Sequence, residues 1–135
     1  MGVIVDTSVL VSLERGGHAL EKLVAGREHE PFGVSVVTVS ELLHGVHRAD
    51  SEKRRLKRSA FVEKVIQTFP LYSFDLSVAR MYAKVWANLA KKGVVIGAHD
   101  LMIASTALAL GFSIVTSDMR DYGKIREVSV EKFSV

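Results

Sequence analysis

Residues 100–118 read DLMIASTALALGFSIVTSD, an uncharged apolar run with an aspartate at each end. Apolar residues recur at helical spacing over 101–110 and predict a buried helix, which a glycine then ends. Residues 112–116 predict a short strand. A ten-residue helix is roughly 15 Å long and a five-residue strand roughly 16 Å. The chain therefore returns to the edge from which it started, and we expect Asp100 and Asp118 to lie close together.

A membrane span is the rival interpretation of this run. A span needs about 20 apolar residues, whereas this run is shorter, includes a glycine and several hydroxyl residues, and is closed by acids. The N-terminus has no basic region typical of a signal peptide. The chain has no cysteine, which excludes disulfides and cysteine-ligated metals. We therefore expect no membrane segment and a cytoplasmic location.

Strand and helix patterns alternate along the rest of the chain. Apolar runs at 3–5 and at 34–37, the second interrupted only by Ser35, predict strands that are buried on both faces. Further strands are predicted over 71–74 and 125–130. Helices are predicted between the strands, at 9–14, 18–27, from Thr38 to Asp50, at 52–68 and from Asp75 to Gly93. This alternation predicts an α/β fold, with a mainly parallel sheet of four to five strands flanked by helices, as one domain over 1–135.

Two finer expectations concern the helices. The pair Thr38 and Glu41 matches a capping box, which would begin a helix at Thr38. In the helix over 52–68, the apolar spacing turns Leu56 toward the core.

Four acids follow the predicted strands or begin the next helix. Because parallel strands with right-handed crossovers share a carboxyl edge, these acids should meet at one rim, where open α/β sheets bind ligands. Each alone has a structural explanation as a turn or helix cap. Together they would repel one another unless a cation lay between them. They are Asp6, Glu41, Asp100 and Asp118.

Carboxylate oxygens are the natural ligands of Mg²⁺ or Mn²⁺. Paired divalent ions support phosphodiester hydrolysis by activating water and stabilising the leaving oxygen. The formal net charge of +3 is modest, but basic residues crowd the segment 48–64. Local basicity suits a phosphate backbone, although a solvated helix face has the same composition. The predicted RNA-binding residues are Arg48, Lys53, Arg54 and Arg55.

Three stretches carry a resemblance to a known family: VIVDTSVLVSL at 3–13, TVSELLHGVHRA at 38–49 and HDLMIASTALALGFSIVTSDMRDY at 99–122. In order and spacing they resemble the PIN-domain ribonucleases, specifically the VapC-type toxins of toxin–antitoxin pairs. The resemblance implies a PIN-like fold and an Mg²⁺- or Mn²⁺-dependent endoribonuclease. It also implies an RNA substrate such as tRNA or rRNA, homodimers, and a cognate antitoxin that threads a segment into the active-site groove.

Carried over by position, the four acids named above correspond to the catalytic, metal-binding acids of the family. Thr116 and Ser8 correspond to hydroxyl residues that support the site. Asp121 precedes Tyr122, where phenylalanine is more usual. Either Asp118 or Asp121 could lie closer to the metal, and Asp118 is favoured.

Other interpretations stay open. A housekeeping PIN nuclease in RNA processing, or a catalytically silent nucleic-acid-binding PIN module, would share these motifs. A receiver domain is disfavoured because Asp6 has no acidic neighbour. Tyr82 and Trp86 lie on a helix with core spacing, which indicates core or dimer interface rather than a base-stacking surface.

Overall fold

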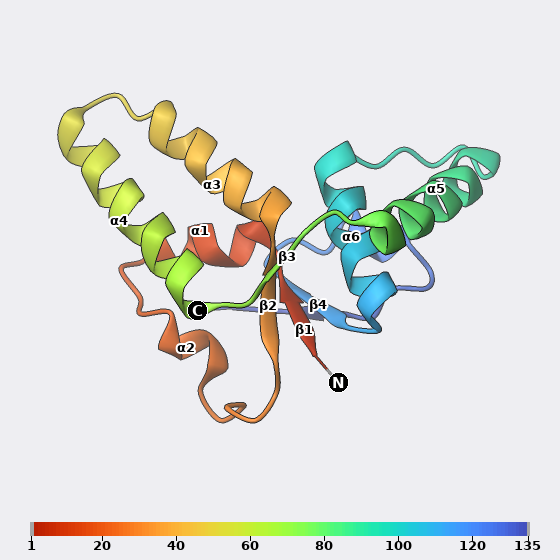
Figure 1. Cartoon of the computed structure of the whole chain (residues 1–135), viewed down its shortest axis with the longest axis horizontal. Coiled ribbons are helices and arrows are strands. Elements are labelled where there is room, and N and C mark those ends of the chain that lie inside the picture. The colour runs from red at the N-terminus through yellow and green to blue at the C-terminus, as the bar shows by residue number, and fades with distance from the viewer. Residues whose placement is uncertain (1, 135) are drawn as a thin grey trace.

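The computed structural model describes residues 2–134, in which each of the first three strands is followed by two helices (Figure 1). The strands are β1 (Val3–Val5), β2 (Phe32–Ser35), β3 (Leu71–Tyr72), β4 (Ser113–Thr116) and β5 (Val130–Lys132). The helices are α1 (Thr7–Arg15), α2 (Glu21–Val24), α3 (Val36–His47), α4 (Glu52–Thr68), α5 (Leu76–Lys91) and α6 (Ala98–Leu110), with a short 3₁₀ turn, η1, at Tyr122–Lys124.

The strands form one parallel sheet in the order β3-β2-β1-β4-β5. This confirms the predicted α/β class and the predicted parallel sheet. β1 lies at the centre, between β2 and β4. The chain passes from β1 to β2 and β3 on one side and later returns to β4 and β5 on the other side of β1. The carboxyl end of β1 is therefore the point where a ligand crevice is expected.

Two apolar cores lie on the two faces of the sheet. Side chains alternate along a strand, so Val3 and Val5 pack in one core while Ile4 packs in the other. Helices α1 to α4 supply the first core, and α5 and α6 supply the second, as the two groups of helices in Figure 1 show. The core residues of β1 are at most 1% exposed, and this burial fixes the strand at whose end Asp6 lies.

Side-chain caps fix where the helices begin. The carboxylate of Asp6 accepts the backbone N–H of Ser8 and so starts α1 directly after β1. The hydroxyl of Ser35 accepts from Val37 N and starts α3 directly after β2. Because each helix starts at the end of its strand, the first turns of α1 and α3 lie at the same edge of the sheet.

Several finer expectations were wrong. Helix α3 begins at Val36 under the Ser35 cap, so Thr38 and Glu41 form no capping box; Thr38 is instead fully buried, with its hydroxyl 3.0 Å from that of Thr7. Leu56 is 56% exposed rather than inward. The last strand lies at Val130–Lys132, not over 125–130, because Ile125 and Val128 turn back into the second core.

The apolar run between Asp100 and Asp118 forms most of α6 and all of β4. Among the helices between residues 2 and 134, none has both the length and the apolar content that crossing a membrane requires. Gly111 ends α6 with a φ of 71°, the left-handed conformation that glycine adopts without strain.

Candidate active site

Asp6 is the most tightly held acid of the predicted site. It is only 6% exposed. Its Oδ2 accepts hydrogen bonds from Ser8 Oγ at 2.6 Å and Thr116 Oγ1 at 2.9 Å. Its Oδ1 accepts from the hydroxyl of Tyr122 at 2.6 Å. Hydroxyl donors to both oxygens allow a charged carboxylate to stay buried and fixed in direction.

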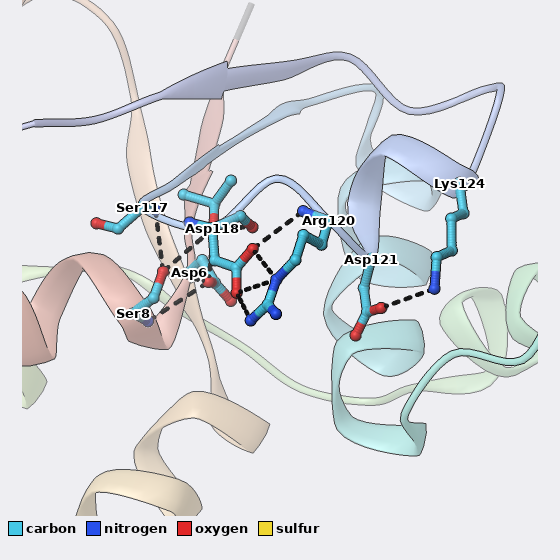
Figure 2. A network of polar contacts seen from close by, with 8 residues as sticks. Asp6, Ser8, Ser117, Asp118, Arg120, Asp121 and Lys124 are labelled. Carbon is cyan, nitrogen blue, oxygen red and sulfur yellow. Dashed lines mark hydrogen bonds and ion pairs between the residues drawn. The ribbon is translucent and has the colours of Figure 1, made fainter.

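Ser8 joins the start of α1 to the end of β4. Its hydroxyl accepts the backbone N–H of Ser117 at 3.0 Å and donates to Asp6 (Figure 2). Thr116 lies beside it, with the two hydroxyl oxygens 3.1 Å apart. The two residues predicted to support the site therefore both touch Asp6.

Glu41 faces the same edge from the second turn of α3. Its Oε1 accepts from Thr7 Oγ1 at 2.7 Å, which ties α3 to the first residue of α1. Its Oε2 lies 3.3 Å from Nδ1 of His99, in the first turn of α6. Sequence reasoning assigned neither Thr7 nor His99 a role, since nothing in the spacing relates them to Glu41.

Asp100 follows His99 in α6. Its side chain is half-buried and approaches Asp6 and Tyr122. The Tyr122 hydroxyl is 3.4 Å from its Oδ1. Burial raises the pKa of Asp100 to about 6, and the neighbouring carboxyls of Asp121 and Asp6 add to the rise. Such a shift is the expected result of like charges crowded in a partly dry site.

Asp118 and Asp121 differ in their partners (Figure 2). Arg120 grips both oxygens of Asp118, with Nη2 to Oδ2 at 2.6 Å, and this hydrogen bond lowers the pKa of Asp118 to about 2. Asp121 has a looser partner, Lys124, at 3.3 Å. Asp121 rather than Asp118 is also the acid whose carboxyl raises the pKa of Asp100. Asp118 and Asp121 both line the pocket of the buried acids, and Asp121 is the one of the two that raises the pKa of Asp100.

All of these acids line one pocket of about 170 Å³. Five of its eight lining side chains are carboxylic acids, so the predicted convergence holds in space. The residues are Asp6, Thr7, Ser8, Glu41, Asp100, Asp118, Asp121 and Tyr122. Tyr122 was not predicted as a site residue; its burial raises its pKa well above the usual value, so the hydroxyl stays protonated and donates.

The donor set fits a hard divalent cation. Between residues 2 and 134, no three acidic or histidine side chains are arranged to hold a metal ion as they stand. Mg²⁺, however, is usually bound by one or two carboxylates together with waters and substrate phosphates. Crowded oxygen ligands with a raised pKa at Asp100 suit such an ion, because a cation relieves their repulsion.

A second, larger groove of about 290 Å³ opens beside the acidic pocket. Thr7 and Glu41 line both, so the groove and the acidic pocket adjoin at these two residues. Apolar side chains from α1, α3 and α4 line it, together with basic residues; the basic residues are Arg15, Arg48, Arg54, Lys57 and Arg58.

The predicted RNA-binding residues divide between this groove and the surface around it. Arg48 and Arg54 line the groove, while Lys53 and Arg55 do not. Arg54 also pairs with Asp50, and Arg55 pairs with Glu52. Exposed pairs of this kind hold weakly. Lys57 and Arg58 also line the groove and belong to the basic segment 48–64, although they were not among the four predicted RNA-binding residues. Arg15 was not predicted, because only the structure brings α1 and α4 together.

Comparison with known proteins gives a consistent match. Residues 3–128 match the model of the PIN domain. The chain is 36% identical over 130 residues to "Ribonuclease VapC" of Rickettsia bellii, and 35% identical over 133 residues to "Ribonuclease VapC1" of Rickettsia felis; each match covers 96% of this chain and 95% of the relative. Among solved structures, VapBC-5 of Mycobacterium tuberculosis, a member of the VapBC family of toxin–antitoxin systems, superposes with a TM-score of 0.76 at 28% identity over 100% of both chains.

Proposed function

The chain belongs to the PIN-domain family, among the VapC ribonucleases, and from this we propose a divalent-metal-dependent endoribonuclease that acts as the toxin of a toxin–antitoxin pair. The proposed reaction is hydrolysis of an RNA phosphodiester bond. One observation carries it: five carboxylates, from four separate places in the chain, line a single small pocket. A fold alone would not require these acids to meet.

The proposed roles follow from the contacts. Bound Mg²⁺ or Mn²⁺ would supply water activation and charge stabilisation at the scissile phosphate. Asp6 and Asp100 would hold the cation from the buried side, with Glu41 and either Asp118 or Asp121 at the open side. Ser8 and Thr116 keep the Asp6 carboxylate aimed at the pocket, since each donates to its Oδ2.

The basic groove supports the choice of a polyanionic substrate. It adjoins the acidic pocket at Thr7 and Glu41, so a strand bound along Arg48 and Arg58 would bring a phosphate near the acids. Phosphate contacts of this kind fix a strand without reading its bases. The groove therefore fits RNA in general, and tRNA or rRNA are proposed substrates only by resemblance to the family.

Two protein partners are proposed, one for the basic groove and one for the outer face of α5. A cognate antitoxin would cover the groove, whose apolar residues Val11, Leu42 and Phe61 offer anchoring sites for a peptide. A second copy of the chain could pack on the exposed edge of α5. There Trp86 is 59% exposed and its ring lies 5.7 Å from that of Tyr82.

The direct test is cleavage of total RNA by the purified, antitoxin-free protein with Mg²⁺ or Mn²⁺. We expect cleavage that EDTA abolishes and that Asp6→Asn and Asp100→Asn remove. Glu127→Gln is the matched control, because it removes an exposed carboxylate outside the pocket. Cleavage that persists in EDTA, or in both aspartate variants, would contradict the proposal.

A further inference from the structure

Tyr122 has two ends in different surroundings. As a whole, Tyr122 is only 2% exposed, and it belongs to the second apolar core with Ile4, Val85 and Leu101. Its hydroxyl, however, leaves that core and lies between two carboxylates. It donates to Asp6 Oδ1 at 2.6 Å and lies 3.4 Å from Asp100 Oδ1. The ring serves packing, but packing does not require a hydroxyl there.

The hydroxyl completes the fixing of Asp6. A carboxylate has two oxygens with two acceptor positions each. Ser8 and Thr116 donate to Oδ2, and in the part of the chain that the structure describes Tyr122 is the sole donor to Oδ1. The remaining acceptor position is on Oδ1. This oxygen and Oδ1 of Asp100 are both contacted by the Tyr122 hydroxyl. Oδ1 can therefore accept one further partner, and Asp6 is one of the residues that line the acidic pocket.

The element that carries Tyr122 strengthens this reading. Tyr122 begins η1, the turn that follows Asp121, so the phenol and a pocket acid are adjacent in the chain. The hydroxyl links this turn to the end of β1 and to the first turn of α6. Three segments that supply pocket acids are therefore joined through one oxygen atom.

We propose that Tyr122 is a positioning residue for the cation site: its hydroxyl holds Oδ1 of Asp6 and Oδ1 of Asp100 side by side, so that a divalent ion meets both without rearrangement. The inference rests on the proposed function, since it concerns the same site. It gives a reason for the hydroxyl at this position, which the packing of the ring in the apolar core does not require. Donors to metal-binding carboxylates typically change metal affinity by 10- to 100-fold.

Tyr122→Phe separates the two ends of the residue, because it removes the hydroxyl and keeps the ring. Tyr82→Phe is the matched control, since Tyr82 packs against Phe74 and Trp86 outside the pocket. Mn²⁺ binding is measured by calorimetry on each variant without RNA, with circular dichroism to verify the fold. We expect Tyr122→Phe to weaken Mn²⁺ binding by about 10- to 100-fold and Tyr82→Phe to bind as the parent does.

Unchanged Mn²⁺ affinity in a folded Tyr122→Phe variant would overturn the inference. Tighter binding would also overturn it, because it would show that the Tyr122 hydroxyl competes with the cation for Asp6. If the variant does not fold, Mg²⁺ is titrated into the parent protein with ¹³C-labelled tyrosine. The Tyr122 ring-carbon resonance should then shift with the midpoint that calorimetry gives for Mg²⁺ on the parent protein, while the Tyr82 resonance stays. An unmoved Tyr122 signal overturns the inference. A parent protein that binds no Mn²⁺ and cleaves no RNA would remove the proposed function as well.

Discussion

Arg120 grips the carboxylate of Asp118, two residues before it, with Nη2 2.6 Å from Oδ2 and Nε 3.0 Å from Oδ1. A bidentate guanidinium pair occupies the acceptor positions that a cation would use. Asp121, three residues further on, has only Lys124 at 3.3 Å and influences Asp100 directly. The acid favoured from sequence is thus the one that already has a guanidinium partner, and its neighbour Asp121 is the alternative fourth acid.

Asp121→Asn should therefore reduce RNA cleavage more than Asp118→Asn does. We expect about a tenfold difference in kcat/KM, because Asp121 acts on the buried acids while Asp118 is partnered by Arg120. Steady-state cleavage of a short RNA measures both variants under one set of conditions. The reverse order, with Asp118→Asn the more damaged variant, would restore Asp118 to the site.

Stability of the metal-free protein should depend on pH through Asp100. Its pKa is raised to about 6 from 3.8, so between these values the folded state binds more protons than the unfolded state. Stability then falls as pH rises from about 4 to about 6, and stays lowered above that window. For a half-exposed group the loss is on the order of 1 kcal/mol.

Urea unfolding in EDTA across pH 4–7 measures this loss, with Asp100→Asn for comparison. The variant carries no titrating group at this position, so its stability should change less over the window than that of the parent. Parallel pH profiles for the two proteins would show that Asp100 is not under electrostatic strain.

Thr7→Val should weaken catalysis through Glu41. The Thr7 hydroxyl donates to Glu41 Oε1 at 2.7 Å, and valine keeps the branched shape without the donor. We expect kcat/KM to fall about tenfold, because a hydrogen bond to a charged group contributes about 1.5–3 kcal/mol. Thr106→Val is the control, since that buried hydroxyl bonds only within α6, to Met102 O. Equal activity of both variants would leave Thr7 with a structural role alone.

Arg48→Ala should reduce RNA affinity more than Lys53→Ala, because Arg48 lines the groove and Lys53 does not. Binding of an uncleaved strand is followed in the Asp6→Asn background at several salt concentrations. Loss of one phosphate contact lowers the slope of log K against log salt by about 0.7 for a single strand. Equal slopes for the two variants would indicate that the strand follows another surface.

Much of the fold was predictable because burial leaves a strong pattern. Val3–Val5 and the helix over 52–68 were predicted with the bounds that the structure has. The start of α3 was not, since Thr38 and Glu41 imitate a capping box while Ser35 caps the helix. Leu56 was misplaced because periodicity reports spacing but not whether another element covers that face.

Convergence of the four acids was predictable from topology alone, since parallel strands share one carboxyl edge. Their partners were not. Tyr122 and Asp6 are 116 residues apart in the sequence, and Thr7 and Glu41 are 34 apart. No pattern of nearby residues therefore predicts either contact. The catalytic and metal-binding roles of the acids remain predictions that the experiments above address.

The chemistry of the cleaved ends tests most directly whether the crowded carboxylates direct water at an RNA phosphodiester bond. The measurement is end analysis of the products by phosphatase, kinase and mass spectrometry after cleavage by the purified protein with Mg²⁺. Attack by water predicts 5′-phosphate and 3′-hydroxyl ends that disappear in Asp6→Asn and Asp100→Asn. Products ending in a 2′,3′-cyclic phosphate would show attack by the ribose hydroxyl and contradict the proposed mechanism.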